Sequence, residues 1–175
     1  MKTNIALIGF MGTGKTAVGK ALAEKLQRKF VELDSLIEQK AGKPITDIFQ
    51  QEGEIAFREL EIEVAKEVSG GKSLVIACGG GVVLNKINID RLRQHSRIVY
   101  LTASPAAILS RTDGRDERPL LNVPDQALRI QELLKFRNPF YERAADIEID
   151  TTRLDVESVV EQIIDRLKED ESFHF

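Results

Sequence analysis

Short apolar runs alternate with longer amphipathic segments along most of the chain. Five of these runs have the length and composition of buried strands: Asn4–Ile8, Phe30–Leu33, Leu74–Cys78, Ile98–Leu101 and Ile147–Ile149. Helix-length sequence separates each run from the next. The alternation predicts a three-layer α/β/α fold with a central five-stranded parallel sheet, because strands that are apolar on both faces need helices on both sides. Such sheets bind ligands beyond the carboxyl ends of their strands.

The segments between the apolar runs have helical spacing. The first helix is expected around Val18–Leu26, and the last carries the cleanest apolar stripe, with Asp155 as its expected N-cap. A long helical segment rich in paired charges covers residues 44–68. Residues 112–139 break the pattern, because they hold three of the five prolines and no strand pattern. No repeat or linker divides the chain, so we treat residues 1–175 as a single domain.

Composition and charge exclude several classes of protein. The hydrophobic share of 42% and the charged share of 30% are those of ordinary globular proteins, not of disordered or transmembrane chains. The net charge of −3 favours neither nucleic acid nor a membrane surface as partner. The single cysteine, Cys78, cannot form an internal disulfide and is expected to be a small buried hydrophobe. The run Ile5–Phe10 is too short to span a bilayer and does not resemble a signal peptide, so we expect a cytoplasmic protein. The sequence shows no obvious extra element, so we expect a monomer.

The most specific motif follows the first predicted strand. Residues 9–16 read Gly-Phe-Met-Gly-Thr-Gly-Lys-Thr, which fits G-x-x-x-x-G-K-[ST], and a predicted helix comes next. Glycines let the backbone wrap phosphates closely and point N–H groups at them from a helix N-terminus. Lys15 adds a positive charge, and Thr16 offers a hydroxyl to Mg²⁺. The motif predicts that ATP and Mg²⁺ are bound by Gly12, Thr13, Gly14, Lys15, Thr16 and Ala17.

A phosphate-binding loop of this kind occurs in kinases, GTPase switches and motors. Guanine specificity commonly needs N-K-x-D, but the nearest sequence here, residues 85–88, ends in Asn88, which is the wrong acceptor. Motor ATPases favour an apolar strand that ends in an acidic pair, whereas Leu74–Cys78 is followed by three glycines. A small-molecule kinase is therefore the favoured interpretation. A nucleotide-dependent binding switch without an acceptor substrate is the alternative from another class.

Several further motifs, in this order and spacing, resemble those of shikimate kinases. They are Asp34, Glu54-x-x-Phe57-Arg58-x-x-Glu61, Gly79-Gly80-Gly81, Arg118-Pro119-Leu120-Leu121 and Arg137-x-x-x-Tyr141. The resemblance extends nearly from end to end. It implies transfer of the ATP γ-phosphate to the 3-hydroxyl of shikimate in chorismate biosynthesis, with a substrate-binding segment at about 33–61 and a mobile lid at about 112–124. Gluconate kinases and nucleoside monophosphate kinases are the nearest rivals.

The resemblance implies how the acceptor is bound. Shikimate carries one carboxylate and three hydroxyls on a small ring. Arg58 and Arg137 would bind the carboxylate through their forked N–H donors, and Gly80 would offer its backbone to the ring. Asp34 would accept the proton of the attacking hydroxyl.

The resemblance also implies how the nucleotide is bound. Arg118, in the lid, would neutralise charge on the transferring phosphoryl group, so that Lys15, Asp34 and Arg118 form the expected catalytic set. Arg111 would stack on adenine, and Arg153 would contact the nucleotide. The family usually has D-x-D after the second strand, where this chain has Glu32-Leu33-Asp34. We expect Glu32 to serve Mg²⁺ together with Thr16, by accepting hydrogen bonds from its bound waters.

Each of these residues also has a purely structural interpretation. Glu54 and Arg58 are spaced as an i, i+4 pair on a helix surface, worth about 0.2–0.5 kcal/mol. Asp34 precedes a helical pattern and could be its N-cap. Residues 79–81 could form a plain tight turn. The remaining arginines, Arg111, Arg118 and Arg137, could be ordinary surface charges.

Overall fold

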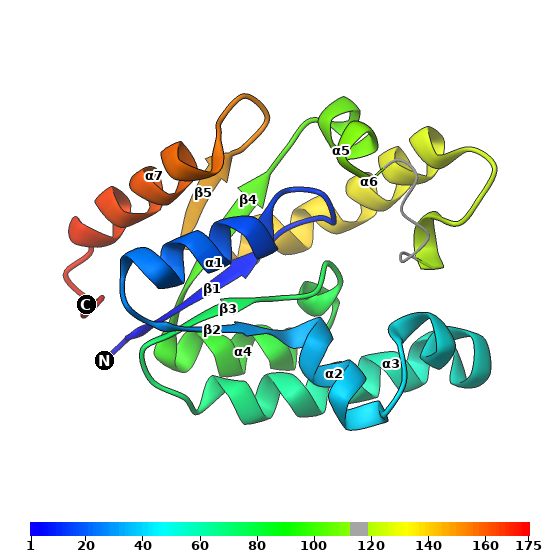
Figure 1. Ribbon diagram of the computed structural model, residues 1–175, viewed down its shortest axis with the longest axis horizontal. Helices are drawn as coiled ribbons and strands as arrows, with labels where there is room; N and C mark the ends of the chain where they lie inside the picture. The colour runs from blue at the N-terminus through cyan, green and yellow to red at the C-terminus, as the bar shows by residue number, and fades with distance from the viewer. Residues whose placement is uncertain (113–118) are drawn as a thin grey trace.

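The strands form one parallel sheet at the centre of the fold. Figure 1 shows the computed structural model, which describes residues 1–112 and 119–175. The strands are β1 (Asn4–Ile8), β2 (Lys29–Glu32), β3 (Leu74–Ala77), β4 (Ser96–Thr102) and β5 (Ile147–Asp150). They lie in the order β2-β3-β1-β4-β5, and every pairing is parallel. The predicted five-stranded parallel sheet is confirmed.

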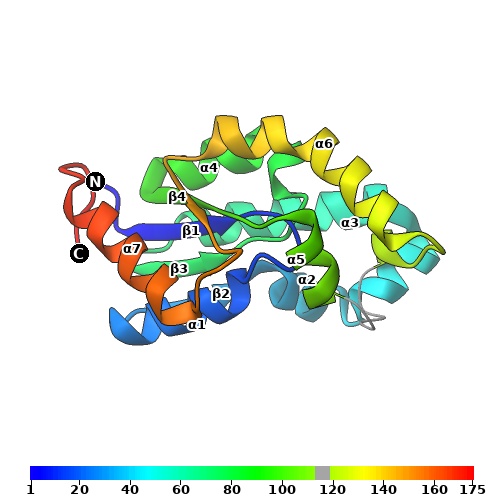
Figure 2. The ribbon, with the colours of Figure 1, turned by 90° about the horizontal axis from the view of Figure 1, so that it is seen from above.

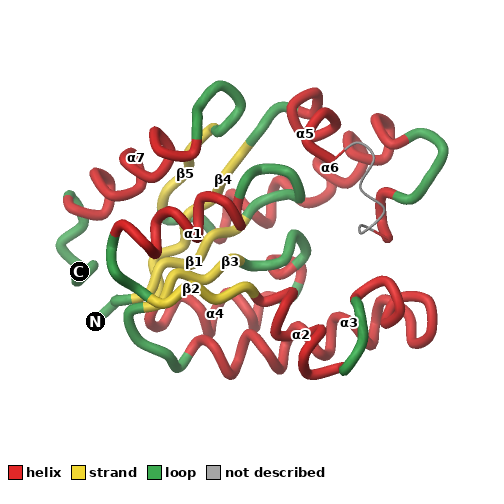
Figure 3. The backbone as a smooth tube through the Cα atoms, in the orientation of Figure 1, coloured by secondary structure: helices red, strands yellow, loops and turns green. Residues whose placement is uncertain are grey.

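Helices cover both faces of the sheet, as Figures 2 and 3 show. On one face lie α1 (Lys15–Lys25) and α7 (Val156–Lys168). On the other face lie α3 (Ile45–Ser69), α4 (Lys86–His95) and α6 (Gln126–Ala144). Two shorter helices, α2 (Leu33–Ala41) and α5 (Pro105–Thr112), extend beyond the carboxyl edge of the sheet. The described residues also form two 3₁₀ turns, η1 (Val82–Leu84) and η2 (Pro119–Leu121).

The central strand β1 shows why the sheet needs two helical layers. All five of its residues are buried. Ile5 and Leu7 pack in the core under α1 and α7, whereas Ala6 and Ile8 pack in the core on the opposite face. Side chains alternate along a strand, so four consecutive apolar residues, Ile5–Ile8, require cover on both faces. The predicted bounds of this strand agree with the structure.

The junction of β2 and α2 differs from its prediction. Leu33 was expected to end the strand, but it begins α2, and its side chain is fully buried. An apolar residue at the end of a short apolar run is easily taken for part of a strand. Here it is the first residue of a helix, and it is buried in the same core as α3 residues such as Val64. Asp34 consequently lies in the first turn of α2, and Glu32 occupies the N-cap position. The interpretation of Asp34 as an N-cap is wrong.

The ends of other elements agree better with the pattern. Asp155 caps α7, because its Oδ1 accepts a hydrogen bond from the amide of Ser158 at 2.7 Å. The long charged segment is α3, interrupted at Gly53, which has a φ of 86°.

Of the expected lid at 112–124, residues 113–118 lie outside the described residues. In the described part of the chain, no helix combines the length and apolar character that crossing a membrane would require.

Candidate active site

The phosphate-binding loop joins β1 to α1 at the carboxyl edge of the sheet. Gly12 has a φ of 79° and Gly14 a φ of 96°, which side chains with a Cβ rarely adopt. Gly14 is the N-cap of α1, so the amides of the first turn open toward the loop. This backbone matches what the motif predicts for an anion site at a helix N-terminus.

A cleft of about 580 Å³ lies over this loop. Its lining includes six of the residues expected to bind nucleotide: Gly12, Gly14, Lys15, Thr16, Ala17 and Arg111. Nζ of Lys15 donates to the carbonyls of Gly9 at 2.7 Å and Phe10 at 2.9 Å. Oγ1 of Thr16 donates to Oε1 of Glu32 at 2.8 Å, which brings these two expected metal-site residues together at the cleft.

Two other expected nucleotide residues, Thr13 and Arg153, do not line this cleft, and a third falls outside the described part of the chain. The side chain of Thr13 is buried away from this cleft, and its hydroxyl donates to the carbonyl of Phe10 at 2.8 Å. Arg153 is exposed on the loop between β5 and α7, and it is not among the described residues that line the cleft. Arg118 lies outside the described residues.

Arg111 connects the phosphate-binding loop to the segment after β5. Its Nη1 donates to the carbonyl of Gly12 at 3.0 Å, and its Nη2 donates to the carbonyl of Thr151 at 2.9 Å. The guanidinium plane therefore lies at the wall of the cleft and is not an isolated surface charge.

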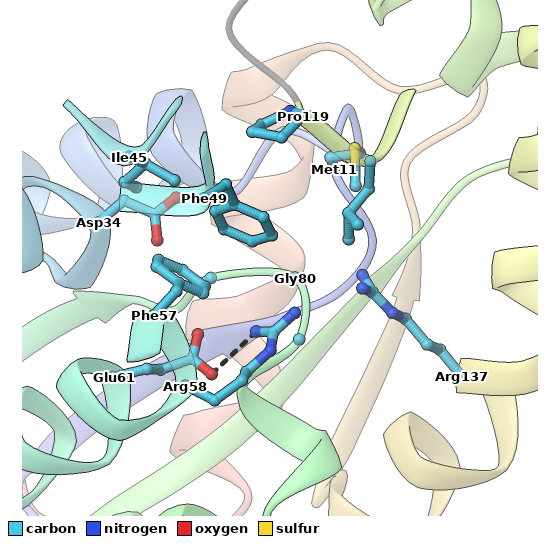
Figure 4. A pocket seen from close by; sticks show the side chains of 13 residues that line it. Met11, Asp34, Ile45, Phe49, Phe57, Arg58, Glu61, Gly80, Pro119 and Arg137 are labelled. Atoms are coloured by element: carbon cyan, nitrogen blue, oxygen red, sulfur yellow. Dashed lines mark hydrogen bonds and ion pairs between the residues drawn. The ribbon is translucent and has the colours of Figure 1, made fainter. Parts of the chain in front are cut away.

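A second, smaller pocket of about 110 Å³ adjoins the first cleft, and Figure 4 shows its side chains. Arg58 comes from α3 and Arg137 from α6, and both lie against the glycine loop that follows β3. Nη1 of Arg137 lies 3.3 Å from where a Cβ on Gly80 would stand, and a Cβ on Gly81 would collide with the guanidinium of Arg58. Gly80 and Gly81 are needed here because the two guanidinium groups leave little or no space for a side chain. A plain tight turn would not require glycine for this reason.

Two buried carboxyl groups lie beside the same glycine loop. Oδ1 of Asp34 and Oε2 of Glu61 have no hydrogen-bond partner among the described residues. A Cβ on Gly79 would stand 2.8 Å from the first oxygen and 3.0 Å from the second. Burial raises the pKa of Asp34, with Lys15 acting against it, and burial likewise raises the pKa of Glu61 against the effect of Arg58. An unpartnered buried oxygen is a candidate contact for a substrate hydroxyl or a water.

The two clefts share part of their lining. Met11, Asp34, Gly79 and Gly80 belong to both. Asp34 is therefore within reach of a phosphate group on one side and of a small polar molecule on the other. An arrangement of this kind is suited to transfer of a group between two ligands.

Comparisons with known proteins decide the family. The family model for shikimate kinase matches residues 11–168. A shikimate kinase of Symbiobacterium thermophilum is 44% identical over 168 residues, which covers 95% of this chain and 97% of the relative. One from Thermodesulfovibrio yellowstonii is 48% identical, covering 92% of each chain. The solved structure of the Acinetobacter baumannii shikimate kinase in complex with shikimate superposes with a TM-score of 0.94 at 37% identity, covering 98% of this chain and 96% of that one.

The chain belongs to the shikimate kinase family. It is therefore a kinase that uses ATP to phosphorylate shikimate, and the resemblance inferred from its motifs is confirmed. The gluconate and nucleoside monophosphate kinases, and the switch without an acceptor, are not favoured.

Glu61 belongs to a sequence motif of the acceptor pocket but was assigned no role from the sequence. Its carboxylate is fully buried, and its Oε1 lies 3.0 Å from Nη1 of Arg58. The i, i+4 pair also exists, since Oε1 of Glu54 lies 3.3 Å from Nη2 of the same arginine. The i, i+3 spacing of Arg58 and Glu61 was the available signal, but helical spacing alone does not distinguish a buried carboxylate from a solvated one. Cys78 is buried as expected, and burial raises the pKa of its thiol to about 12.

Proposed function

We propose that the protein transfers the γ-phosphate of ATP to the 3-hydroxyl of shikimate through the residues of the two joined clefts. The observation that carries this proposal is the position of Asp34, which lines both clefts and keeps one buried oxygen without a partner among the described residues. A nucleotide over the phosphate-binding loop and a ring in the smaller pocket would meet at this carboxylate.

Arg58 and Arg137 are proposed to bind the carboxylate of shikimate. The two guanidinium groups approach the glycine loop from different helices, so they can contact one anion together (Figure 4). Arginine presents parallel N–H donors that match the geometry of a carboxylate. Gly80 would face the ring with its backbone, which leaves room that a side chain would fill.

Asp34 is proposed to accept the proton of the attacking hydroxyl. Burial raises the pKa of Asp34, which makes its carboxylate a stronger base than an exposed one. In the reaction the hydroxyl oxygen forms a bond to the γ-phosphorus while the bond from that phosphorus to the bridging oxygen breaks. The proton goes to Asp34, and ADP carries away the electron pair of the broken bond.

The donor side is proposed to use the amides of residues 12–17 together with two cations. Lys15 would exchange its contacts with loop carbonyls for phosphate oxygens, and Arg111 would stack on adenine from the cleft wall. Arg118, although outside the described residues, would neutralise charge on the transferring group. Arg153 would contact the nucleotide from the loop before α7, where its side chain is exposed.

Thr16 and Glu32 are proposed as the protein side of a Mg²⁺ site. A hydroxyl and a carboxylate, 2.8 Å apart, are the hard oxygen donors that Mg²⁺ prefers. When bound, the ion would neutralise phosphate charge. Glu32 would accept hydrogen bonds from the waters bound to the ion and so orient them. This role tolerates the one methylene by which the glutamate side chain is longer than that of aspartate.

The setting of the reaction is also a proposal. We propose a cytoplasmic monomer of one domain, 1–175, that binds shikimate and nucleotide and needs neither nucleic acid nor a membrane. The small net charge of −3 supports the absence of a nucleic acid or membrane partner. The spread of the proposed site residues from Gly12 to Arg153 supports a single domain. Sedimentation of the purified protein with and without substrates tests the oligomeric part.

A coupled assay of ADP release tests the reaction with shikimate, gluconate, AMP and CMP as separate acceptors. We expect turnover that depends on shikimate and on none of the other three. Turnover with gluconate or a nucleotide alone would assign the pocket to that acceptor. ATP hydrolysis that no acceptor changes would support the binding switch instead.

A further inference from the structure

Tyr141 connects α6 to the glycine loop of the acceptor pocket. It lies four residues after Arg137, none of its surface is exposed, and its hydroxyl donates a hydrogen bond to the carbonyl of Gly80. We propose that Tyr141 is a positioning residue that ties the loop 79–81 to Arg137 and so sets the shape of the acceptor pocket. The inference rests on the proposed function, which assigns Gly80 and Arg137 to the acceptor.

The hydrogen bond to Gly80 differs from those of its neighbours in the loop. The carbonyls of Gly79 and Gly81 accept amides from the next turn of the chain, each at 3.1 Å. These bonds hold the loop to itself. The carbonyl of Gly80 instead accepts a hydroxyl from 61 residues further along the chain. This bond therefore fixes the loop relative to α6, which carries Arg137.

The same hydroxyl lies in reach of Arg137. Burial raises the pKa of Tyr141 to about 12, and the charge and hydrogen bonding of Arg137 act against this effect. At neutral pH the hydroxyl thus keeps its proton, which it donates to Gly80, while its lone pairs can accept from the guanidinium. Because the guanidinium also packs 5.7 Å from the ring centroid of Phe10, it is held between the phosphate-binding loop and the acceptor loop.

The aromatic ring and the hydroxyl of Tyr141 have separate tasks. The ring stacks on Tyr100 with 5.0 Å between centroids and 22° between planes, so it belongs to the core. Gly80 and Arg137 line the acceptor pocket, whereas Tyr141 is not among its described lining residues. The hydroxyl therefore acts through these two groups and does not touch the acceptor. Phenylalanine would preserve the ring contacts and remove only this connection.

Steady-state kinetics of Tyr141→Phe test the proposal. Loss of a buried hydrogen bond should raise the KM for shikimate roughly tenfold, while the KM for ATP stays within about twofold. Tyr100→Phe is the matched control, because it removes the other hydroxyl of the same stacked pair, which lies 3.3 Å from Oδ1 of Asn138. We expect the control to leave both KM values within about twofold of the parent.

The outcomes separate this inference from the proposed function. An unchanged KM for shikimate in Tyr141→Phe, or an equal rise for both substrates, overturns the positioning role. A parent protein without shikimate-dependent turnover defeats the proposed function instead.

If the Tyr141→Phe protein does not fold, a second measurement that keeps Tyr141 tests the proposal. The chain has two tyrosines, so 3-fluorotyrosine in Tyr100→Phe protein labels Tyr141 alone. We expect its fluorine resonance to shift on addition of shikimate, because binding at Arg137 changes the hydrogen bonds of the hydroxyl. A non-hydrolysable ATP analogue alone should leave the resonance in place. A resonance that shikimate does not move overturns the proposal.

Discussion

Nη1 of Arg58 lies 3.0 Å from Oε1 of Glu61, a carboxylate with none of its surface exposed. Nη2 of the same guanidinium lies 3.3 Å from Oε1 of Glu54, whose side chain is 48% exposed. One arginine thus has a buried partner and a solvated one on the same helix. Water screens the attraction to Glu54 far more than that to Glu61, so the two carboxylates should contribute unequally.

We predict that Glu61→Ala lowers the free energy of unfolding by about 3 kcal/mol, because it leaves the largely buried guanidinium without its main partner. The KM for shikimate should also rise in Glu61→Ala, because Arg58 is no longer held in place. Glu54→Ala, the matched control on the same arginine, should cost no more than about 0.5 kcal/mol. Urea unfolding of the two variants measures the difference. Equal losses would show that the burial of Glu61 does not matter.

The role of Glu61 could not be predicted from the sequence for a physical reason. Charges at i, i+3 and i+4 describe a helix surface, but they do not say which part of that surface another element covers. Glu61 is buried because the loop that follows β3 lies against α3, a contact between residues far apart in the chain. The resemblance named several of the residues that line the pocket, including Arg58. It did not identify the unpartnered oxygens beside Gly79.

We predict that Arg58→Ala and Arg137→Ala weaken shikimate binding roughly ten- to a hundredfold and leave ATP binding nearly unchanged. Each change removes a charge-assisted hydrogen bond, worth about 1.5–3 kcal/mol. Arg143→Ala is the control, since this arginine lies on α6 with Arg137 but packs on Phe140. Titration calorimetry with each ligand provides the comparison. Equal weakening of both ligands would count against the assignment to the acceptor.

We predict that Asp34→Asn abolishes turnover and yet raises the melting temperature at neutral pH. Burial raises the pKa of Asp34 in the folded state above its unfolded value. Below the pKa that Asp34 has in the unfolded state, its burial costs no stability, because the carboxyl group is protonated in both states. The free energy of unfolding then falls as the pH rises through the pKa that Asp34 has in the folded state. Asparagine avoids that loss, so its advantage should grow from about pH 4 upward. Melting curves across this range check it, and a variant that is less stable than the parent at pH 7 refutes the argument.

Glu32 gives a prediction about metal dependence. Glu32→Ala should raise the Mg²⁺ concentration needed for half-maximal rate and lower turnover, with little change in the affinity for shikimate, because a partner for the waters of the ion is gone. Glu32→Asp should be mild. In Asp34→Asn, by contrast, turnover should be lost at every Mg²⁺ concentration. A Mg²⁺ titration of the Glu32→Ala protein that matches the parent curve would remove Glu32 from the metal site.

Local pattern was sufficient for the sheet and insufficient for the junctions at its edge. β1 was predicted to the residue, because Asn4 is followed by four apolar residues that are buried on both faces of the sheet. Leu33 misled the prediction of β2, since burial by a neighbouring helix looks the same in sequence as burial in a strand. Gly53 interrupts α3 because it adopts a positive φ. A glycine in a helical pattern permits such a φ, but the sequence does not show whether it is adopted.

We predict that the hydroxyl nearest Asp34 receives the phosphate while Arg58 and Arg137 bind the carboxylate of shikimate. The most direct test compares ADP release with shikimate and with an analogue that lacks only the 3-hydroxyl. We expect turnover with shikimate, no turnover with the analogue, and inhibition by the analogue that is competitive with shikimate. Comparable ADP release with both compounds would contradict it.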